Sequence, residues 1–427
     1  MKRKTAIKIL IILLLIILGV FSYLIFFKKD GSEPKEVVLP NQPSSNFFPD
    51  SEPDSEDNNN TEDFNNDRFT AISKLRQISD NPVAGFIIFD RETDTSNRII
   101  LEQEEKLDKE YETIYRFTNK SNGNIFETTS RTPSLKRLTN NTIPKIKESI
   151  FSKTLENVVF RYLDDSETIE SYFSKIIMDK NSTTTQIGEG DFVKLESSFL
   201  QKNINNISFS EDGLVFYTVN VGDESYGYIF DINNPNNPEF SFSSNLRDIR
   251  TEWFKDNSIL LGTKPSSVSN GLLFEYNFDT QKITKILEGG YGFNFLSKNN
   301  NDTIIYSELS RSEINSYSYN TRTKETLDLN LNTIVSDKCA WSNKLDTVIY
   351  CAVPNSKIGS GYPNLWHQGQ VSFNDSLFKI DTETGLKLQI TGLEEDFDIT
   401  KLQVSDDDEY IVFINKKDLT LWSLDIK

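Results

Sequence analysis

The stretch Lys338–Ile390, KCAWSNKLDTVIYCAVPNSKIGSGYPNLWHQGQVSFNDSLFKIDTETGLKLQI, decides the predicted fold of this chain. It contains four short segments that are rich in aromatic and β-branched residues, at 338–342, 347–353, 376–381 and 386–390. Such residues suit a pleated strand, and the segments between them hold polar turns and one long loop. Four antiparallel strands in about 45 to 50 residues are typical of one blade of a β-propeller.

Further copies of this unit follow one another along the chain. In each copy an inner strand ends in an aromatic or apolar residue and a small polar turn follows. The copies end near Ser152, Ser210, Lys255, Ser297, Ser342 and Ser405. Successive spacings are 58, 45, 42, 45 and 63 residues, so the two outermost spacings contain insertions. A repeat near 45 residues indicates four-stranded propeller blades and not a solenoid of shorter repeats.

The predicted fold class is therefore all-β, with seven blades over residues 69–427 and with six or eight blades as the alternatives. The seventh blade supplies only three strands of its own, the last near Leu419–Leu424. Lys74–Ile78 resembles the fourth strands of other blades. We expect it to complete the seventh blade and close the ring, because an incomplete blade would leave an exposed sheet edge.

The N-terminal segment is predicted to anchor the propeller to a cell membrane. Ile9–Phe27 holds nineteen residues without a charge, and as a helix it would span about 28 Å, close to the hydrocarbon thickness of a bilayer. Four cationic residues precede it and Lys28 and Lys29 follow it, which favours a cytoplasmic N-terminus and an extracytoplasmic body. A cleaved signal peptide is the alternative, but the segment stays bulky up to the lysines.

Three regions follow from these features. Residues 1–29 are predicted as a cytoplasmic stub and transmembrane anchor, 30–68 as an acidic disordered linker, and 69–427 as the propeller domain. Glu33–Asp67 carries ten acidic residues and one lysine, so little in it can pack. The linker is expected to hold the propeller away from the membrane.

Charge and histidine content exclude several classes of function. The net charge is −18, so a nucleic-acid partner is not expected. His367 is the single histidine, whereas sites that use histidine ligands or bases usually need more than one such residue or a catalytic neighbour. No metal site, no cofactor and no catalytic constellation is predicted. Paired carboxylates remain a route to glycan hydrolysis, because the chain has 64 acidic residues.

Three segments carry a resemblance to a known repeat, namely Phe209–Phe216, Leu377–Gly385 and Val404–Tyr410. They resemble the WD40-like and TolB-type propeller repeat, which joins an F-S-P-D-G-type turn to a later strand ending in D-x-x-T-G. The chain lacks the turn proline and the Gly-His and Trp-Asp signatures. The resemblance implies a propeller fold and no particular ligand. As a whole, the chain is similar to uncharacterised membrane-anchored propeller proteins of bacteria, for which no activity is implied.

Cys339 and Cys351 are the only cysteines, and they are predicted on adjacent strands of one hairpin whose turn is centred near Lys344 and Leu345. Directly opposed residues in such a hairpin have Cβ atoms roughly 4.5 to 5.5 Å apart, which is near disulfide reach. An extracytoplasmic body favours oxidation. We therefore expect a disulfide, with two buried thiols as the alternative.

The insertion Asn355–Asn374 is the strongest candidate for a ligand site. It joins the second and third strands of its blade, a connection that in a propeller lies over the central channel. It holds Tyr362, Trp366, His367 and Gln368, whose rings and amides suit stacking and hydrogen bonding to a sugar or a peptide. The simpler interpretation is a lid that packs its own tryptophan over the channel mouth.

Other segments are interpreted as structural or are left without a role. Asp406–Glu409 lacks the alternating acids and the glycine of a calcium loop, which indicates a solvated hairpin turn. The long loops Arg91–Glu110 and Met178–Asp191 are predicted on the opposite face of the ring from the insertion.

Together these features predict a non-enzymatic binding or scaffolding propeller for envelope proteins or peptides, held outside the cell membrane by a single-pass anchor. The alternative is a carbohydrate-binding or carboxylate-based glycan-hydrolysing propeller.

Overall fold

The computed structural model describes residues 74–93, 110–177, 193–310, 313–359, 361–393 and 395–427. The chain divides into two units, Met1–Phe69 and Thr70–Lys427, and the described residues all belong to the second. The predicted anchor, the predicted linker and most of the two long loops lie outside the described residues. Within the described ranges, no helix has the length and apolar character needed to cross a bilayer.

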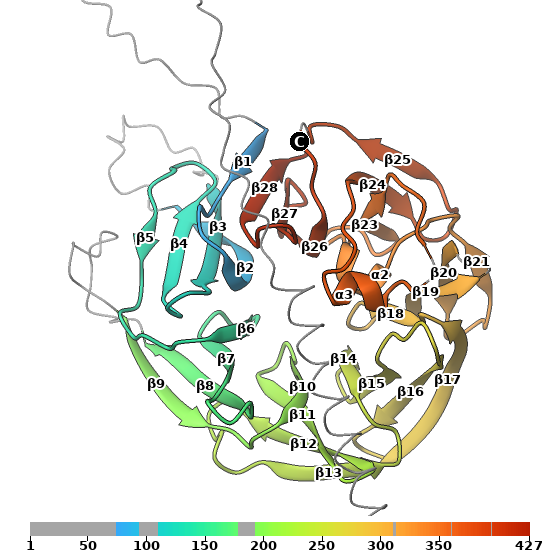
Figure 1. Cartoon of the computed structure of the whole chain (residues 1–427), viewed down its shortest axis with the longest axis horizontal. Coiled ribbons are helices and arrows are strands. Elements are labelled where there is room, and N and C mark those ends of the chain that lie inside the picture. The colour runs from blue at the N-terminus through green and yellow to red at the C-terminus, as the bar shows by residue number, and fades with distance from the viewer. Residues whose placement is uncertain (1–73, 94–109, 178–192, 311–312, 360, 394) are drawn as a thin grey trace, which may run out of the picture. The chain divides into compact units, whose positions relative to one another are not determined.

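The described strands form seven four-stranded antiparallel sheets that stand in a ring around a central axis (Figure 1). The prediction of an all-β, seven-bladed propeller is therefore confirmed. In blades one to six the four strands follow one another in sequence, and the first strand of each blade lies nearest the axis (Figure 1).

Blades one to three consist of β2 (Val83–Glu92), β3 (Tyr111–Asn119), β4 (Ile125–Thr129), β5 (Lys136–Arg137), β6 (Ile146–Phe151), β7 (Asn157–Leu163), β8 (Ile169–Ile177), β9 (Lys194–Phe199), β10 (Ile204–Phe209), β11 (Leu214–Val221), β12 (Glu224–Asp231) and β13 (Glu239–Ser244). Blades four to six consist of β14 (Ile249–Lys255), β15 (Ser258–Thr263), β16 (Asn270–Asn277), β17 (Lys282–Tyr291), β18 (Asn294–Ser297), β19 (Thr303–Ser310), β20 (Glu313–Asn320), β21 (Thr326–Asp328), β22 (Cys339–Trp341), β23 (Val348–Pro354), β24 (Asp375–Asp381) and β25 (Lys387–Ile390). The seventh blade consists of β26 (Ile399–Val404), β27 (Tyr410–Asn415), β28 (Leu421–Asp425) and β1 (Leu75–Gln77). Two single-turn helices, α2 (Val335–Lys338) and α3 (Asn364–His367), flank β22 and β23 of blade six.

The N-terminal strand β1 is the fourth strand of the last blade. It pairs antiparallel with β28, with Leu75 opposite Leu424 and Gln77 opposite Trp422. This is the pairing that the sequence of Lys74–Ile78 predicts. Apolar side chains of blades seven and one pack into one buried cluster behind it. The added strand thus covers the edge that the three C-terminal strands would otherwise expose.

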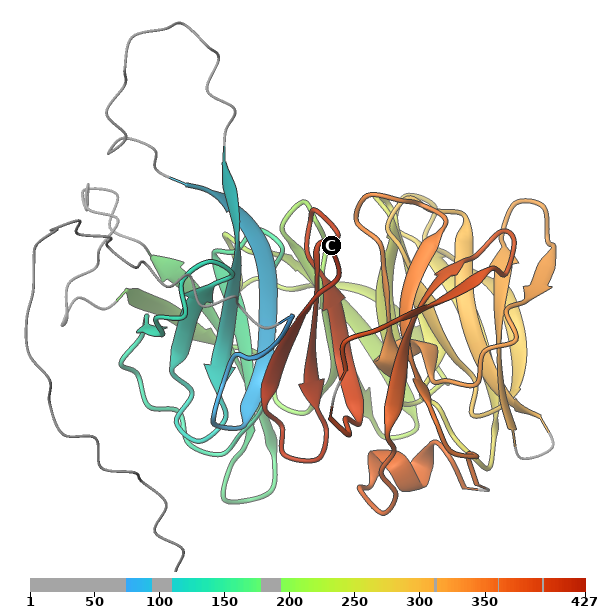
Figure 2. The same ribbon diagram turned by 90° about the horizontal axis from the view of Figure 1, so that it is seen from above.

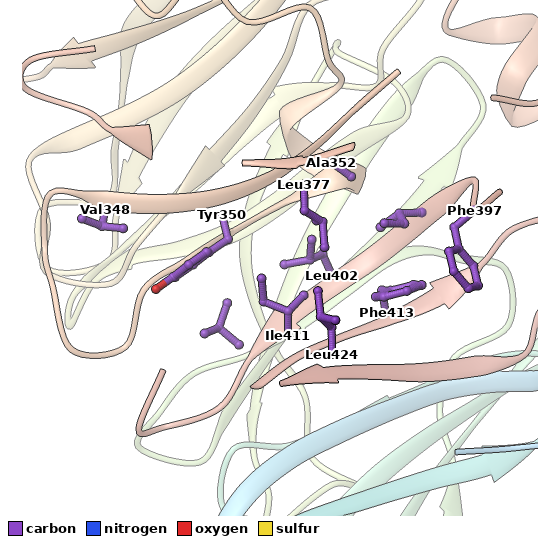
Figure 3. Close-up of a cluster of buried hydrophobic side chains, with 11 residues drawn as sticks. Val348, Tyr350, Ala352, Leu377, Phe397, Leu402, Ile411, Phe413 and Leu424 are labelled. Atoms are coloured by element: carbon purple, nitrogen blue, oxygen red, sulfur yellow. The ribbon is translucent and has the colours of Figure 1, made fainter. Parts of the chain in front are cut away.

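Neighbouring blades are joined by apolar side chains between their faces. Figure 3 shows the cluster between blades six and seven, in which Tyr350 packs with Ile411 and Leu402. A strand that is covered on both faces needs a continuous apolar run. The second strand β7 supplies one in Val158–Phe160, which is fully buried.

The inner strands of successive blades approach one another closely and are linked by side chains. A Cβ atom on Gly85 of β2 would lie 2.0 Å from the carbonyl oxygen of Ser149 in β6, so only glycine fits there. Between blades three and four, the backbone N–H of Thr251 donates to Oδ1 of Asn206 at 3.0 Å. Such links hold the inner strands of neighbouring blades together around the axis. Side chains from several inner strands therefore face the central channel.

Candidate functional site

A cavity of about 640 Å³ occupies the central channel. This channel cavity is lined by Lys153, Ser208, Phe209, Glu211, Thr251, Glu252, Trp253, Leu296, Ser297, Lys298, Asn299, Ser336, Cys339, Ala340, Trp341, Asn343 and Leu402. These residues come from six of the seven blades, mainly from the ends of inner strands and the turns that follow them. The volume lies in the range of sites for small molecules or a few residues of peptide.

The channel has two chemically different ends. At the turn end, the inner strands finish and turns lead to the second strands; Glu211, Asn299 and Asn343 lie in these turns. At the loop end, the inner strands begin and the insertion 355–374 is found. Helix α3, drawn in orange, marks the loop end at the lower face of the ring in Figure 2. The turns that line the cavity place it toward the turn end.

Aromatic side chains form the apolar part of the channel cavity. Trp253 donates its Nε1–H to the carbonyl oxygen of Ser208 at 3.3 Å, and the next residue, Phe254, is a β-bulge that is fully buried. Trp341, the last residue of β22, is 8 % exposed, and its Nε1 is buried without a hydrogen-bond partner. A buried N–H without an acceptor is rare and costs free energy.

Charged and amide side chains surround these rings at the turn end. Lys153 Nζ lies 2.7 Å from Glu211 Oε1, and this hydrogen bond holds the pKa of the Glu211 carboxyl below its usual value. Lys298 Nζ lies 2.7 Å from Asp346 Oδ1. Oδ1 of Asn299 is buried without a hydrogen-bond partner. The residues that line the channel cavity therefore include one buried acceptor and one buried donor without a hydrogen-bond partner.

A disulfide braces the strand that carries Trp341. Cys339 and Cys351 are directly opposite in the pairing of β22 with β23, and their Sγ atoms are bonded at 2.05 Å. Cys339 itself lines the channel cavity. The bond thus ties the short inner strand of blade six to its longer neighbour β23, which is buried at all positions but Val353.

The structure separates the four residues that were predicted to form a ligand platform. Tyr362 and Trp366 are 2 % and 1 % exposed and pack with Phe373 beneath the loop, whereas His367 and Gln368 are exposed. Tyr362 and Trp366 therefore do not present a stacking surface, because the loop's own residues cover their rings. The structure agrees with the simpler interpretation of this insertion, a lid whose own tryptophan is packed in its interior.

A buried charge cluster of Lys338, Asp375 and Asp398 fastens this lid, and no feature of the sequence indicates it. The Lys338 ammonium bonds both carboxylates, with Nζ 2.9 Å from Asp398 Oδ1, and all three side chains are fully buried. Trp366 donates its Nε1–H to Asp398 at 2.9 Å, and the backbone N–H of Phe373 donates at 3.1 Å. The cluster links α2, the insertion and blade seven.

The two carboxylates of the buried charge cluster have different electrostatic environments. Burial raises the pKa of Asp375, and Lys338 only partly offsets this effect. Burial acts in the same direction on Asp398, but Lys338 and the hydrogen bond from Trp366 outweigh it and lower the pKa of that carboxyl. Both carboxylates are counter-charges of Lys338, and the pKa of only one of them, Asp398, is lowered.

Acidic side chains in the channel cavity and in the turn before β27 are held by hydrogen bonds and ion pairs. Among the described residues, no group of three or more His, Cys, Asp and Glu side chains is placed to hold a metal ion. The acidic run that includes Asp407 forms a turn, in which Asp407 accepts a hydrogen bond from the backbone N–H of Glu409 at 3.0 Å. In the channel cavity, Glu211 is paired with a lysine, and Glu252 accepts the backbone N–H of Ser297 at 2.8 Å.

No protein-family model matches this sequence, and no curated protein matches it. Solved structures do match in fold. TolB from Acinetobacter baumannii is 9% identical over 71% of this chain and 79% of its own, with a TM-score of 0.41. The Pan2 WD40 domain from Neurospora crassa is 11% identical over 82% and 95%, with a TM-score of 0.48. An oligogalacturonate lyase from Vibrio parahaemolyticus is 10% identical over 74% and 86%, with a TM-score of 0.45. By its own sheet order this chain is a seven-bladed β-propeller, and the propellers that it resembles include TolB-type and WD40 structures.

Proposed function

We propose that this chain is a non-enzymatic binding module that takes a segment of an envelope protein or peptide into the channel cavity. The observation that carries the proposal is the buried, unpartnered Nε1–H of Trp341 in the wall of that cavity. A peptide backbone supplies a carbonyl for this donor and an N–H for Oδ1 of Asn299. Its side chains would pack on Phe209 and Trp253.

The proposal places the propeller outside the cell membrane. The uncharged segment 9–27 would span the bilayer, and the acidic segment 30–68 would act as a tether. The disulfide between Cys339 and Cys351 suits an oxidising compartment. In membrane fractionation, the protein should pellet and its N-terminal peptide should be recovered by mass spectrometry. A mature start near residue 30, or a body accessible only from the cytoplasm, would contradict this part of the proposal.

Site-specific photo-crosslinking tests the site in the full-length protein. A photoreactive phenylalanine analogue replaces Phe209 in the channel cavity, and the matched control carries it in place of Leu386, which is 74% exposed just before the outer strand β25. After irradiation of intact membranes, we expect a defined peptide bound at position 209 and not at position 386. Equal labelling at both positions, or none at position 209, would contradict the proposal.

A second variant separates ligand contact from folding. Trp341→Phe keeps an aromatic ring but removes the unpartnered N–H. Because that donor has no partner in the free protein, its loss should not weaken folding through a broken hydrogen bond. Cross-linking yield should nevertheless fall, since one hydrogen bond to the ligand is worth about 1 kcal/mol, or roughly fivefold in affinity. An unchanged yield would show that this donor does not contact the ligand.

A glycan is the second candidate ligand. Tryptophan faces also stack on sugar rings, and two carboxylates, Glu211 and Glu252, line the same cavity. A panel of glycans and chromogenic glycosides separates the two candidates. Binding or turnover in that panel, lost in a Trp253→Ala variant, would favour the glycan.

A further inference from the structure

The loop end of the channel carries a group of cations that the proposed function does not yet use. We call this group the cationic mouth, and it consists of Lys120, Lys147, Arg161, Lys264 and Lys401. In a chain whose net charge is −18, such a group does not follow from overall composition.

Strand direction brings these five residues to the same end of the ring. Lys147 and Lys401 lie near the starts of the inner strands β6 and β26. Arg161 lies near the end of the second strand β7, and Lys120 and Lys264 directly follow the second strands β3 and β15. Because first and second strands are antiparallel, the start of one lies beside the end of the other. The five cations come from blades one, two, four and seven.

Direct contacts join several members of the cationic mouth across blades. Glu148 of β6 accepts Lys401 at 2.9 Å on one carboxylate oxygen and Arg161 at 2.9 Å on the other. The first of these ion pairs links blade seven to blade two. Lys264 Nζ donates to the amide oxygen of Asn205 at 2.6 Å, and Lys120 Nζ to a backbone carbonyl at 3.4 Å. The ammonium groups of Lys120 and Lys264 thus have neutral acceptors.

Two members of the cationic mouth, Arg161 and Lys401, are ion-paired, both with Glu148. Asp164, Asp165 and Glu167 line one pocket with Lys120 and Lys147, but Asp165 is paired with Lys145, which is not a member of the mouth. Glu148 and Asp248 are the carboxylates that act on the pKa values of Lys120 and Lys264. Burial lowers the pKa of both lysines, and for Lys120 the repulsion from other lysines of the mouth lowers it further. A negative charge brought to the mouth would raise these pKa values by attraction and so oppose both effects.

We infer that the peptide taken into the channel cavity is acidic and that its carboxylates lie in the cationic mouth. This inference rests on the proposed function. Strand β26 runs from the mouth toward the cavity, since Lys401 belongs to the mouth and the next residue, Leu402, lines the cavity. The cations come from four blades, so a ligand with several carboxylates along its length reaches more of them than one small anion does. An extended acidic peptide has this form.

Binding of labelled peptides to the full-length protein tests the inference. The probes are a short fluorescent peptide of alternating glutamate and glycine, the same peptide with glutamine in place of each glutamate, and inorganic polyphosphate as competitor. The variant Lys147→Gln/Lys264→Gln removes two cations of the mouth without touching the Glu148 ion pairs. Lys282→Gln, on the outer strand β17, is the matched control for lost charge.

We expect the glutamate peptide to bind at least tenfold more tightly than the glutamine peptide in anisotropy titrations. The double variant should bind the glutamate peptide with an affinity about fivefold lower for each lysine replaced, the change expected for one solvent-exposed charge contact. The control variant should bind with unchanged affinity. Added salt should weaken binding of the glutamate peptide alone.

Three results would overturn the inference. Equal binding of both peptides would leave the proposed function standing and refute only the acidic preference. Competition by polyphosphate at the same concentration as the glutamate peptide would show a site for any polyanion. Absence of binding by either peptide, together with no cross-link at Phe209, would refute the proposed function as well.

Discussion

Replacing Lys338 by methionine would leave two carboxylates in the core without their cation. Methionine has nearly the length of the lysine stem, so the change removes charge and little volume. Asp398 would keep the hydrogen bonds from Trp366 and the backbone of Phe373. Asp375 would keep only the backbone N–H of Ile399, at 2.7 Å, because its other oxygen is buried without a partner. Asp375 is therefore the group that we expect to take up a proton.

The expected magnitude follows from complete burial of the pair. Breaking a buried ion pair by removing one partner costs about 3–5 kcal/mol. For a domain of this size, we expect Lys338→Met to lower the melting temperature by about 4–7 °C. Lys285→Met is the matched control, because Lys285 and its partner Glu288 are each about half exposed. Exposed ion pairs contribute less than about 1 kcal/mol, so the control should melt within about 2 °C of the parent protein.

Thermal unfolding by circular dichroism measures both variants, and a double variant identifies the stranded carboxylate. Lys338→Met/Asp375→Asn should recover part of the loss, since the amide carries no charge and the two sites share one network. The single variant should also recover stability as the pH falls, because protonating Asp375 removes the uncompensated charge. If Lys338→Met costs no more than Lys285→Met, or if the double variant is simply additive, the account of the buried charge cluster is refuted.

Three further predictions concern the ring itself. Burial alone would raise the pKa of the Glu148 carboxyl, but its two cationic partners lower that pKa to about 2. As the pH drops from 4.5 toward 2, the unfolded chain binds the proton first, so the stability of the folded protein falls. Glu148→Gln should therefore flatten the acid unfolding curve in that pH window. Deleting residues 70–80 removes β1 and should lower the melting temperature, because β28 gains an open edge; an unchanged melting curve would argue against closure by β1. Non-reducing peptide mapping should recover Cys339 linked to Cys351, and free thiols at both positions in extracytoplasmic material would reject the bond.

The blades could be predicted because each one repeats a short local pattern. Alternating aromatic and β-branched runs, such as Val348–Pro354, specify strands, and the spacing of the inner-strand ends specifies the ring. The hairpin around Lys344 sets a register, and this register placed Cys339 opposite Cys351. The likeness of Lys74–Ile78 to other fourth strands indicated where β1 belongs.

The buried charge cluster could not be predicted, because its members lie far apart in the sequence. Lys338 is 37 residues from Asp375 and 60 from Asp398, and an isolated lysine or aspartate in a sequence indicates a solvent-exposed position. For the same reason Trp366 was interpreted as a ligand platform, although its Nε1–H is bound to Asp398 in the core. A tryptophan in a loop carries no local sign of the partner that buries it.

The channel cavity left a partial signal in the sequence. The inner strands end in aromatic or apolar residues at intervals of about 45, and Phe209 and Trp341 are two of these. The repeat explained them as blade structure, and nothing local showed that Trp341 would be left without an acceptor. The β-bulge at Phe254, which accompanies Trp253 in the cavity wall, also depends on the pairing of two strands and not on one segment.

Hydrogen–deuterium exchange tests the central claim, that ligand binds in the channel cavity. The full-length protein is compared with and without the peptide recovered by cross-linking. We predict slower exchange at the ends of β10, β14 and β22 and in the turns that follow them, and no change in the insertion 355–374. Protection confined to that insertion, or to the outer strands of the blades, would contradict the account.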